Sequence, residues 1–177
     1  MIIPRIVIAD ERRGDLVPPS VILVAALKSA GRPIRVFCAG HDEYMIRLVS
    51  LAAGENVTVL DPYTCGSPRI LKTLFQVSCE PNSLNVILAP LGEKMEDDGF
   101  SVFPAGPSLA KTLECPVLPV IYADSSSAVI ARLLEKTVAG IAAHEKIEVP
   151  AVIFASVLNP KEYQLLEVES GRRTPLL

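Results

Sequence analysis

Short apolar runs alternate along this chain with segments in which apolar and polar residues are mixed. Most of the apolar runs are continuous, which is typical of strands that are covered on both faces. Because helix-like segments separate them, the pattern predicts parallel β-α-β units, and hence an α/β domain of three layers around a central, mostly parallel sheet. The predicted strands are Arg5–Ala9, Ile34–Cys38, Val57–Leu60, Val86–Pro90, Val117–Ala123 and Ala151–Val157.

Helix signals fall between these strands. Pro19–Ala30 has a proline near its first turn and Gly31 directly after its end, the usual asymmetry of helix termini. The final residues have no periodic pattern, so we predict one domain over residues 1–169 and a mobile tail, Ser170–Leu177. The other predicted helices are Glu43–Ala53, Pro68–Val77, Ser126–His144, with Ser125 or Ser126 as its cap, and Pro160–Val168.

The connection Leu91–Ser108 is longer than the others and contains Gly92, Gly99, Gly106 and an acidic run at 96–98. Long irregular connections are often functional or disordered. This one follows the carboxyl end of a predicted strand, which is the edge where open α/β sheets bind ligands. It therefore has two interpretations, a ligand-binding loop or a solvated surface loop.

The composition excludes several classes of protein. The 177 residues are 50% hydrophobic and carry a formal net charge of −3 without a clustered basic face, so no nucleic-acid partner is expected. The apolar runs are too short to span a bilayer and no export signal is evident, so we expect a cytoplasmic protein without a membrane partner. The four cysteines are scattered and only two histidines are present. We therefore expect no metal site, and we interpret the cysteines as reduced core residues.

The segment between the first predicted strand and the first predicted helix occupies the place of a phosphate-binding loop. Such a loop needs glycines whose N–H groups converge on the phosphates, a lysine, and a serine or threonine for magnesium. Between Asp10 and Ser20 the chain has one glycine, Gly14, and no lysine, while Pro18 and Pro19 have no N–H to donate. The sequence therefore predicts a degenerate phosphate loop.

Short motifs spread over nearly the whole chain follow one another in a characteristic order: Gly31–Phe37, Gly40–Tyr44, Leu60–Tyr63, Gly106–Lys111, Cys115–Asp124 and Val157–Asn159. In this order and spacing the chain resembles the synthetase domain of cobyrinic acid a,c-diamide synthase, within the dethiobiotin-synthetase-like and MinD/ParA-like group of P-loop proteins. From the second motif on, the family's counterparts are Gly-Pro-Asp-Tyr, Leu-Asp-Pro-Trp, Gly-Ser-x-x-x-Ala-Lys, an Ala-Pro-Val strand ending in Asp, and Val-Leu-Asn. The resemblance implies a fold of the P-loop NTPase type.

The resemblance also implies candidate site residues. It places Asp124 and Asn159 at the nucleotide, where the asparagine faces the base. It places the following residues on the substrate side: Gly40, Asp42, Tyr44 and Asp61. Structural alternatives exist for the four polar positions: Asp42 and Asn159 as helix N-caps, Asp61 as a turn opener before Pro62, and Asp124 as a cap of the next helix. No residue is predicted to be catalytic.

Two departures from the family fall where its chemistry lies. The phosphate loop is degenerate, and residues 89–92 keep a glycine but lack the family's glutamate. We therefore favour a non-hydrolysing homologue without a cofactor, which binds a second copy of itself, a partner protein or a small anionic ligand. The alternative is an ATP-dependent amide ligase that uses MgATP through a nonstandard phosphate loop, or that lacks a glutaminase subunit.

Overall fold

The computed structural model describes residues 3–11, 17–92, 106–141, 146–157 and 159–173. They form a six-stranded sheet in the order β3-β2-β4-β1-β5-β6, in which each neighbouring pair of strands is parallel. β1 lies inside the sheet, where Val7 is opposite Ile87 of β4 and Val117 of β5. The strands are β1 (Arg5–Asp10), β2 (Ile34–Ala39), β3 (Thr58–Leu60), β4 (Leu84–Pro90), β5 (Val117–Tyr122) and β6 (Ile153–Ala155).

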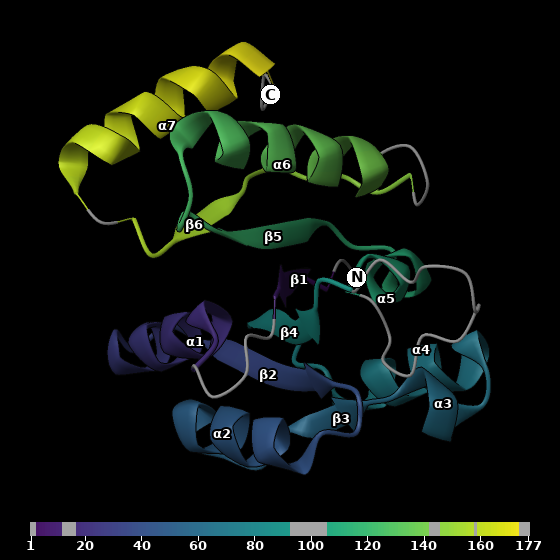
Figure 1. Ribbon diagram of the computed structural model, residues 1–177. Coiled ribbons are helices and arrows are strands. Elements are labelled where there is room, and N and C mark those ends of the chain that lie inside the picture. The colour runs from purple at the N-terminus through teal and green to yellow at the C-terminus, as the bar shows by residue number, and fades with distance from the viewer. Residues whose placement is uncertain (1–2, 12–16, 93–105, 142–145, 158, 174–177) are drawn as a thin grey trace.

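Helices connect the strands and cover the sheet. They are α1 (Pro19–Ser29), α2 (Glu43–Ala53), α3 (Pro62–Cys65), α4 (Pro68–Ser78), α5 (Gly106–Leu113), α6 (Ser127–Gly140) and α7 (Pro160–Arg173). In Figure 1, α1 and α2 lie on one side of the sheet, and α4 and α5 lie on the other. The predicted three-layer α/β domain is therefore confirmed. Among the described helices, none is long and apolar enough to cross a membrane.

The core lies on both faces of the central strands, because successive strand residues point to opposite faces. Val7 and Ile87 are fully buried in a cluster with side chains of α4 and α5. Ile8 and Leu88, one position further along the same strands, are buried with side chains of α1 and α2. Each such aliphatic side chain stabilises the fold by about 1.5–3 kcal/mol on burial. Because the strands are apolar on both faces, each inner strand contributes side chains to the cores on both sides of the sheet.

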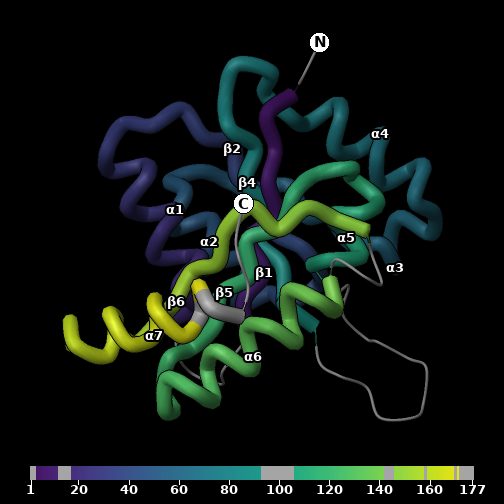
Figure 2. Tube along the Cα trace, turned by 90° about the horizontal axis from the view of Figure 1, so that it is seen from above, coloured from purple at the N-terminus to yellow at the C-terminus, as the bar shows by residue number. Residues whose placement is uncertain are grey.

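A third, smaller core lies at the β5–β6 end of the sheet. There α6 and α7 lie side by side, as both views of the chain show (Figures 1 and 2). Ile121 of β5, Ile130 and Leu134 of α6, and Leu166 of α7 are buried together. Leu166 is the residue that anchors α7, since it is the buried side chain among those described on that helix.

Several boundaries differ from the sequence prediction. The pattern predicts neither α3, which is a single capped turn, nor α5, whose Gly-Pro start is typical of a turn. Because α5 begins at Gly106, the end of the connection Leu91–Ser108 is helical, while residues 93–105 lie outside the described part. α7 continues to Arg173, so helix extends into the predicted tail. α6 ends at Gly140, before the predicted end at His144, and residue 144 is not among those described.

Candidate functional site

The carboxyl end of β1 meets the amino end of α1 in a buried contact between two polar residues. Asp10 is 2% exposed and Ser20 is 1% exposed. One carboxylate oxygen of Asp10 accepts a hydrogen bond from the backbone N–H of Ser20 at 3.3 Å and another from the Ser20 hydroxyl. The last residue of β1 therefore caps α1 across a separation of 10 residues in the chain.

This contact completes the hydrogen bonding at the amino end of α1, where the first N–H groups of a helix have no partner within the helix. Pro18 and Pro19 have no N–H. The Ser20 N–H donates to Asp10, and the Val21 N–H donates to the Pro18 carbonyl at 3.0 Å. Among these described residues, no backbone donor is left for an anion. A carboxylate lies at the helix end that would otherwise attract one.

The amino end of α5 packs closely against the same strand ends. A Cβ atom at Gly106 would lie 2.8 Å from the Cβ of Ala9 and 3.1 Å from the carbonyl oxygen of Pro90. The backbone can approach β1 and β4 this closely only because glycine has no side chain. The Leu91 N–H also donates to the Asp10 carbonyl at 2.8 Å. The strand ends at this corner are thus tightly held between two helices.

The residues that the resemblance assigns to the substrate side lie together after β2 and β3. The two strands are parallel neighbours, so their carboxyl ends share one edge of the sheet. Gly40 has a φ of 86°, and its N–H donates to the Leu60 carbonyl at 3.3 Å. This bond joins the loop after β2 to the end of β3. Tyr44 is 57% exposed at this edge, so an aromatic surface is open to solvent there.

Both aspartates at this edge are helix N-caps: Asp42 caps α2, as its structural interpretation predicts, and Asp61, predicted as a turn opener, caps the single-turn helix α3. The Asp42 carboxylate accepts from the N–H groups of Tyr44 and Met45 at 3.0 and 3.2 Å. The Asp61 carboxylate accepts from the N–H groups of Tyr63 and Thr64 at 3.1 and 3.3 Å. Since these bonds use carboxylate lone pairs, the two side chains have less capacity for a substrate than free carboxylates would have.

The environment of Asp61 favours its charged form. Burial raises its pKa, but hydrogen bonds from the Thr64 hydroxyl and from the N–H groups of Tyr63 and Thr64 outweigh burial. With a smaller contribution from His41, the pKa lies below the usual value of 3.8. Nδ1 of His41 lies 3.8 Å from the Asp61 carboxylate, and the imidazole is 77% exposed. His41 thus connects the loops after β2 and β3.

Asp124 and Asn159, the two candidates for the nucleotide, lie after β5 and β6, and β4 and β1 separate them from the Asp42–Asp61 edge in the sheet order. Oδ1 of Asn159 accepts from the Glu162 N–H at 3.0 Å, so this asparagine caps α7 as its structural interpretation predicts. Ser126, one of the two serines predicted there, occupies the N-cap position of α6, so Asp124 is not the N-cap residue. Ser126 occupies this position without a side-chain cap bond.

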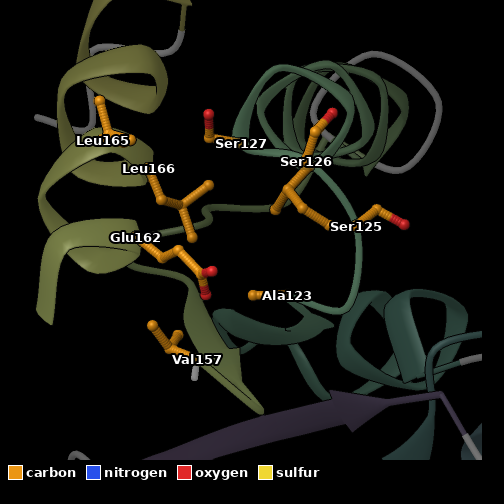
Figure 3. A pocket seen from close by; sticks show the side chains of 9 residues that line it. Ala123, Ser125, Ser126, Ser127, Val157, Glu162, Leu165 and Leu166 are labelled. Atoms are coloured by element: carbon orange, nitrogen blue, oxygen red, sulfur yellow. The ribbon is translucent and has the colours of Figure 1, made fainter. Parts of the chain in front are cut away.

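A cavity of about 150 Å³ opens at this end of the sheet, and we call it the β5–β6 cavity. It lies between the loop after β5, the first turns of α6, and α7 (Figure 3). Neither Asp124 nor Asn159 lines it. Its lining residues are Ala123, Ser125, Ser126, Ser127, Ile130, Val157, Glu162, Leu165 and Leu166.

Sequence reasoning missed two residues of these sites. Asp10 entered it only as a negative charge in the loop, because the sequence does not show that the end of β1 meets the amino end of α1. Glu162 had no distinguishing signal, because a glutamate in the first turn of a helix is common. The packing of α7 against α6 is what places it at the β5–β6 cavity.

Comparison with family models and with curated proteins finds no match. Among solved structures, the chain is similar to chloroplast FtsY from Physcomitrella patens, with a TM-score of 0.56 and 12% identity over 99% of this chain and 56% of that one. It also matches the 54 kDa signal recognition particle protein of Aeropyrum pernix in complex with GDP, with a TM-score of 0.42 and 12% identity over 96% and 50% of the two chains.

The chain therefore spans about half the length of the structures that it resembles. A TM-score below 0.5 does not establish a shared fold, so the FtsY similarity alone bears on the architecture. At 12% identity that similarity shows a fold of the P-loop NTPase type and leaves the activity open.

Proposed function

We propose that this protein is a non-hydrolysing homologue of the synthetase domain of cobyrinic acid a,c-diamide synthase, and that it acts by binding a partner protein or a small ligand. The observation that carries the proposal is the contact between Asp10 and Ser20, which puts a buried carboxylate at the amino end of α1. In phosphoryl transfer the protein contributes mainly positioning and electrostatic stabilisation. A carboxylate at this position opposes both.

The magnitude of the repulsion supports this view. Two like unit charges about 4 Å apart near a protein surface repel each other by about 4 kcal/mol. A repulsion of this size would be comparable with the binding free energy of a millimolar ligand, about −4 kcal/mol. The absence of N–H groups at Pro18 and Pro19 removes the backbone donors that would offset it.

The substrate side supports a binding role. Gly40, Asp42, Tyr44 and Asp61 follow two neighbouring parallel strands, and the side chains of Tyr44 and Tyr63 are 57% and 93% exposed. By resemblance, this is the surface on which the family holds its substrate. The likeness to that family is part of the proposal, since the structural similarity reaches only the fold.

Calorimetry with MgATP and MgGTP tests the proposal. We expect dissociation constants no tighter than about 1 mM for the natural chain. A variant in which residues 10–20 are rebuilt as a glycine-rich loop with lysine should gain at least about tenfold in affinity, equivalent to about 1.4 kcal/mol. The matched control is the same rebuilt loop with alanine in place of the lysine.

Two results would overturn the proposal. A micromolar dissociation constant for MgATP with the natural chain would favour the alternative, an ATP-dependent amide ligase. Hydrolysis of either nucleotide by the natural chain, lost in Asp10→Asn, would assign Asp10 a role in chemistry instead of in blocking the site.

A further inference from the structure

The β5–β6 cavity combines one carboxylate with apolar side chains on one part of its wall and three serines on another. Ile130, Val157, Leu165 and Leu166 supply the apolar side chains, and Glu162 supplies the charge. Leu165 is 50% exposed, so part of its apolar surface is open at the cavity and could be covered by a ligand. This combination differs from the phosphate position at β1, which is closed by a contact within the protein.

The backbone of Glu162 is fixed by a hydrogen bond at the start of α7. Its N–H donates to Oδ1 of Asn159 at 3.0 Å, which fixes the first turn of α7. The side chain extends from α7 toward Ala123, another residue that lines the cavity, and Leu166 extends from the same helix (Figure 3). The Glu162 carboxylate forms no hydrogen bond or ion pair with another residue in the described part of the chain.

We propose that the β5–β6 cavity binds a primary ammonium group on a short alkyl stem, such as n-butylammonium or a lysine side chain. An ionised carboxylate only accepts hydrogen bonds, and an ammonium group only donates them. The methylene stem would lie against Leu165 and Leu166. A dry apolar cavity of about 150 Å³ holds one benzene-sized group, so the volume suits a stem of about four carbons.

The charge balance decides the sign of the ligand. The amino end of α6 faces the same cavity and carries a partial positive charge of about half a unit, which is weaker than the full negative charge of Glu162. A small anion is therefore disfavoured here, and a cation is attracted only moderately. We expect a dissociation constant in the millimolar range, which is reasonable for a ligand of about five heavy atoms. The site is separate from the phosphate position, so this proposal stands whether or not the chain binds nucleotide.

The test is an NMR titration of the full chain that follows backbone amides. n-Butylammonium chloride should shift the amides of Ser125–Ser127 and of Glu162–Leu166, and n-butanol, a neutral ligand with the same number of heavy atoms, should bind up to about fivefold more weakly. Along the series from methylammonium to n-butylammonium, affinity should rise by up to about fourfold per buried CH₂. A lysine-containing peptide that competes for the same amides indicates a protein source of the ligand, and free amines alone indicate a small molecule. Both results support the proposal.

Two variants distinguish an effect of the Glu162 carboxylate in the cavity from an effect of the net charge of the protein. Glu162→Gln should weaken n-butylammonium binding by up to about fivefold and leave n-butanol binding unchanged. Glu167→Gln is the matched control, because Glu167 is exposed on the same helix and does not line the cavity. Three results would each overturn the proposal. The amine and the alcohol could bind equally well, or the two variants could lose equal affinity for the amine. A nucleoside could also shift these amides at a lower concentration than the amine does.

Discussion

Replacing Gly106 by alanine should destabilise the protein at the corner where α5 meets β1 and β4. The added Cβ would lie 2.8 Å from the Cβ of Ala9, 3.1 Å from the Pro90 carbonyl oxygen and 3.3 Å from the Cβ of Ala89. None of these atoms belongs to a flexible side-chain end, so relief requires a shift of the backbone. Overpacking of this kind costs about 1–3 kcal/mol, and the helix propensity gained at the first residue of α5 is small.

Urea unfolding followed by circular dichroism measures the effect. The transition midpoint of Gly106→Ala should fall with an unchanged slope, and the melting temperature should drop by about 2–4 °C for each kcal/mol lost. Gly140→Ala in α6 is the matched control, because an alanine Cβ there would have no atom within 4 Å. It should be neutral or stabilising by up to about 1 kcal/mol. A Gly106→Ala protein as stable as the natural chain would refute the close packing of α5 on β1.

Three further predictions concern charge, thiol chemistry and assembly. Because the folded-state pKa of Asp61 lies below the usual 3.8, its contribution to stability is present above that value and is lost as the pH falls through the folded pKa. Asp61→Asn should therefore flatten the loss of unfolding free energy between about pH 5 and pH 2, and identical acid titrations of the two proteins would contradict this. Burial raises the pKa of the Cys115 thiol to about 11, so iodoacetamide at neutral pH should label half-buried Cys65 and Cys79 before Cys115, as followed by mass spectrometry, and equal labelling rates would be evidence against it. Exposed apolar side chains such as Leu51, at 81%, lead us to expect a homodimer. Light scattering should then give twice the chain mass, whereas a monomer at micromolar concentration would exclude it.

The sequence alone determined the features that depend on neighbours in the chain. The apolar runs predicted all six strands, because the inner strands of the sheet are buried on both faces and therefore consist mostly of apolar residues. The N-caps at Asp42 and Asn159 could also be predicted, since each carboxylate or amide bonds an N–H only two or three residues ahead. Short elements such as α3 were not predicted, because a single helical turn is too short to show a periodic pattern of apolar residues.

The tertiary structure alone decided what the sites contain. The resemblance placed nucleotide and substrate residues in one family pattern, but the strand order puts Asp61 and Asn159 on opposite sides of β4 and β1. Asp10 became the cap of α1 because the parallel sheet brings the end of β1 against that helix, and Glu162 reached the β5–β6 cavity because α7 packs on α6. Gly106 packs against Ala9, although the two residues are far apart in the sequence. Contacts of this kind depend on how the layers pack, which no local pattern of residues encodes.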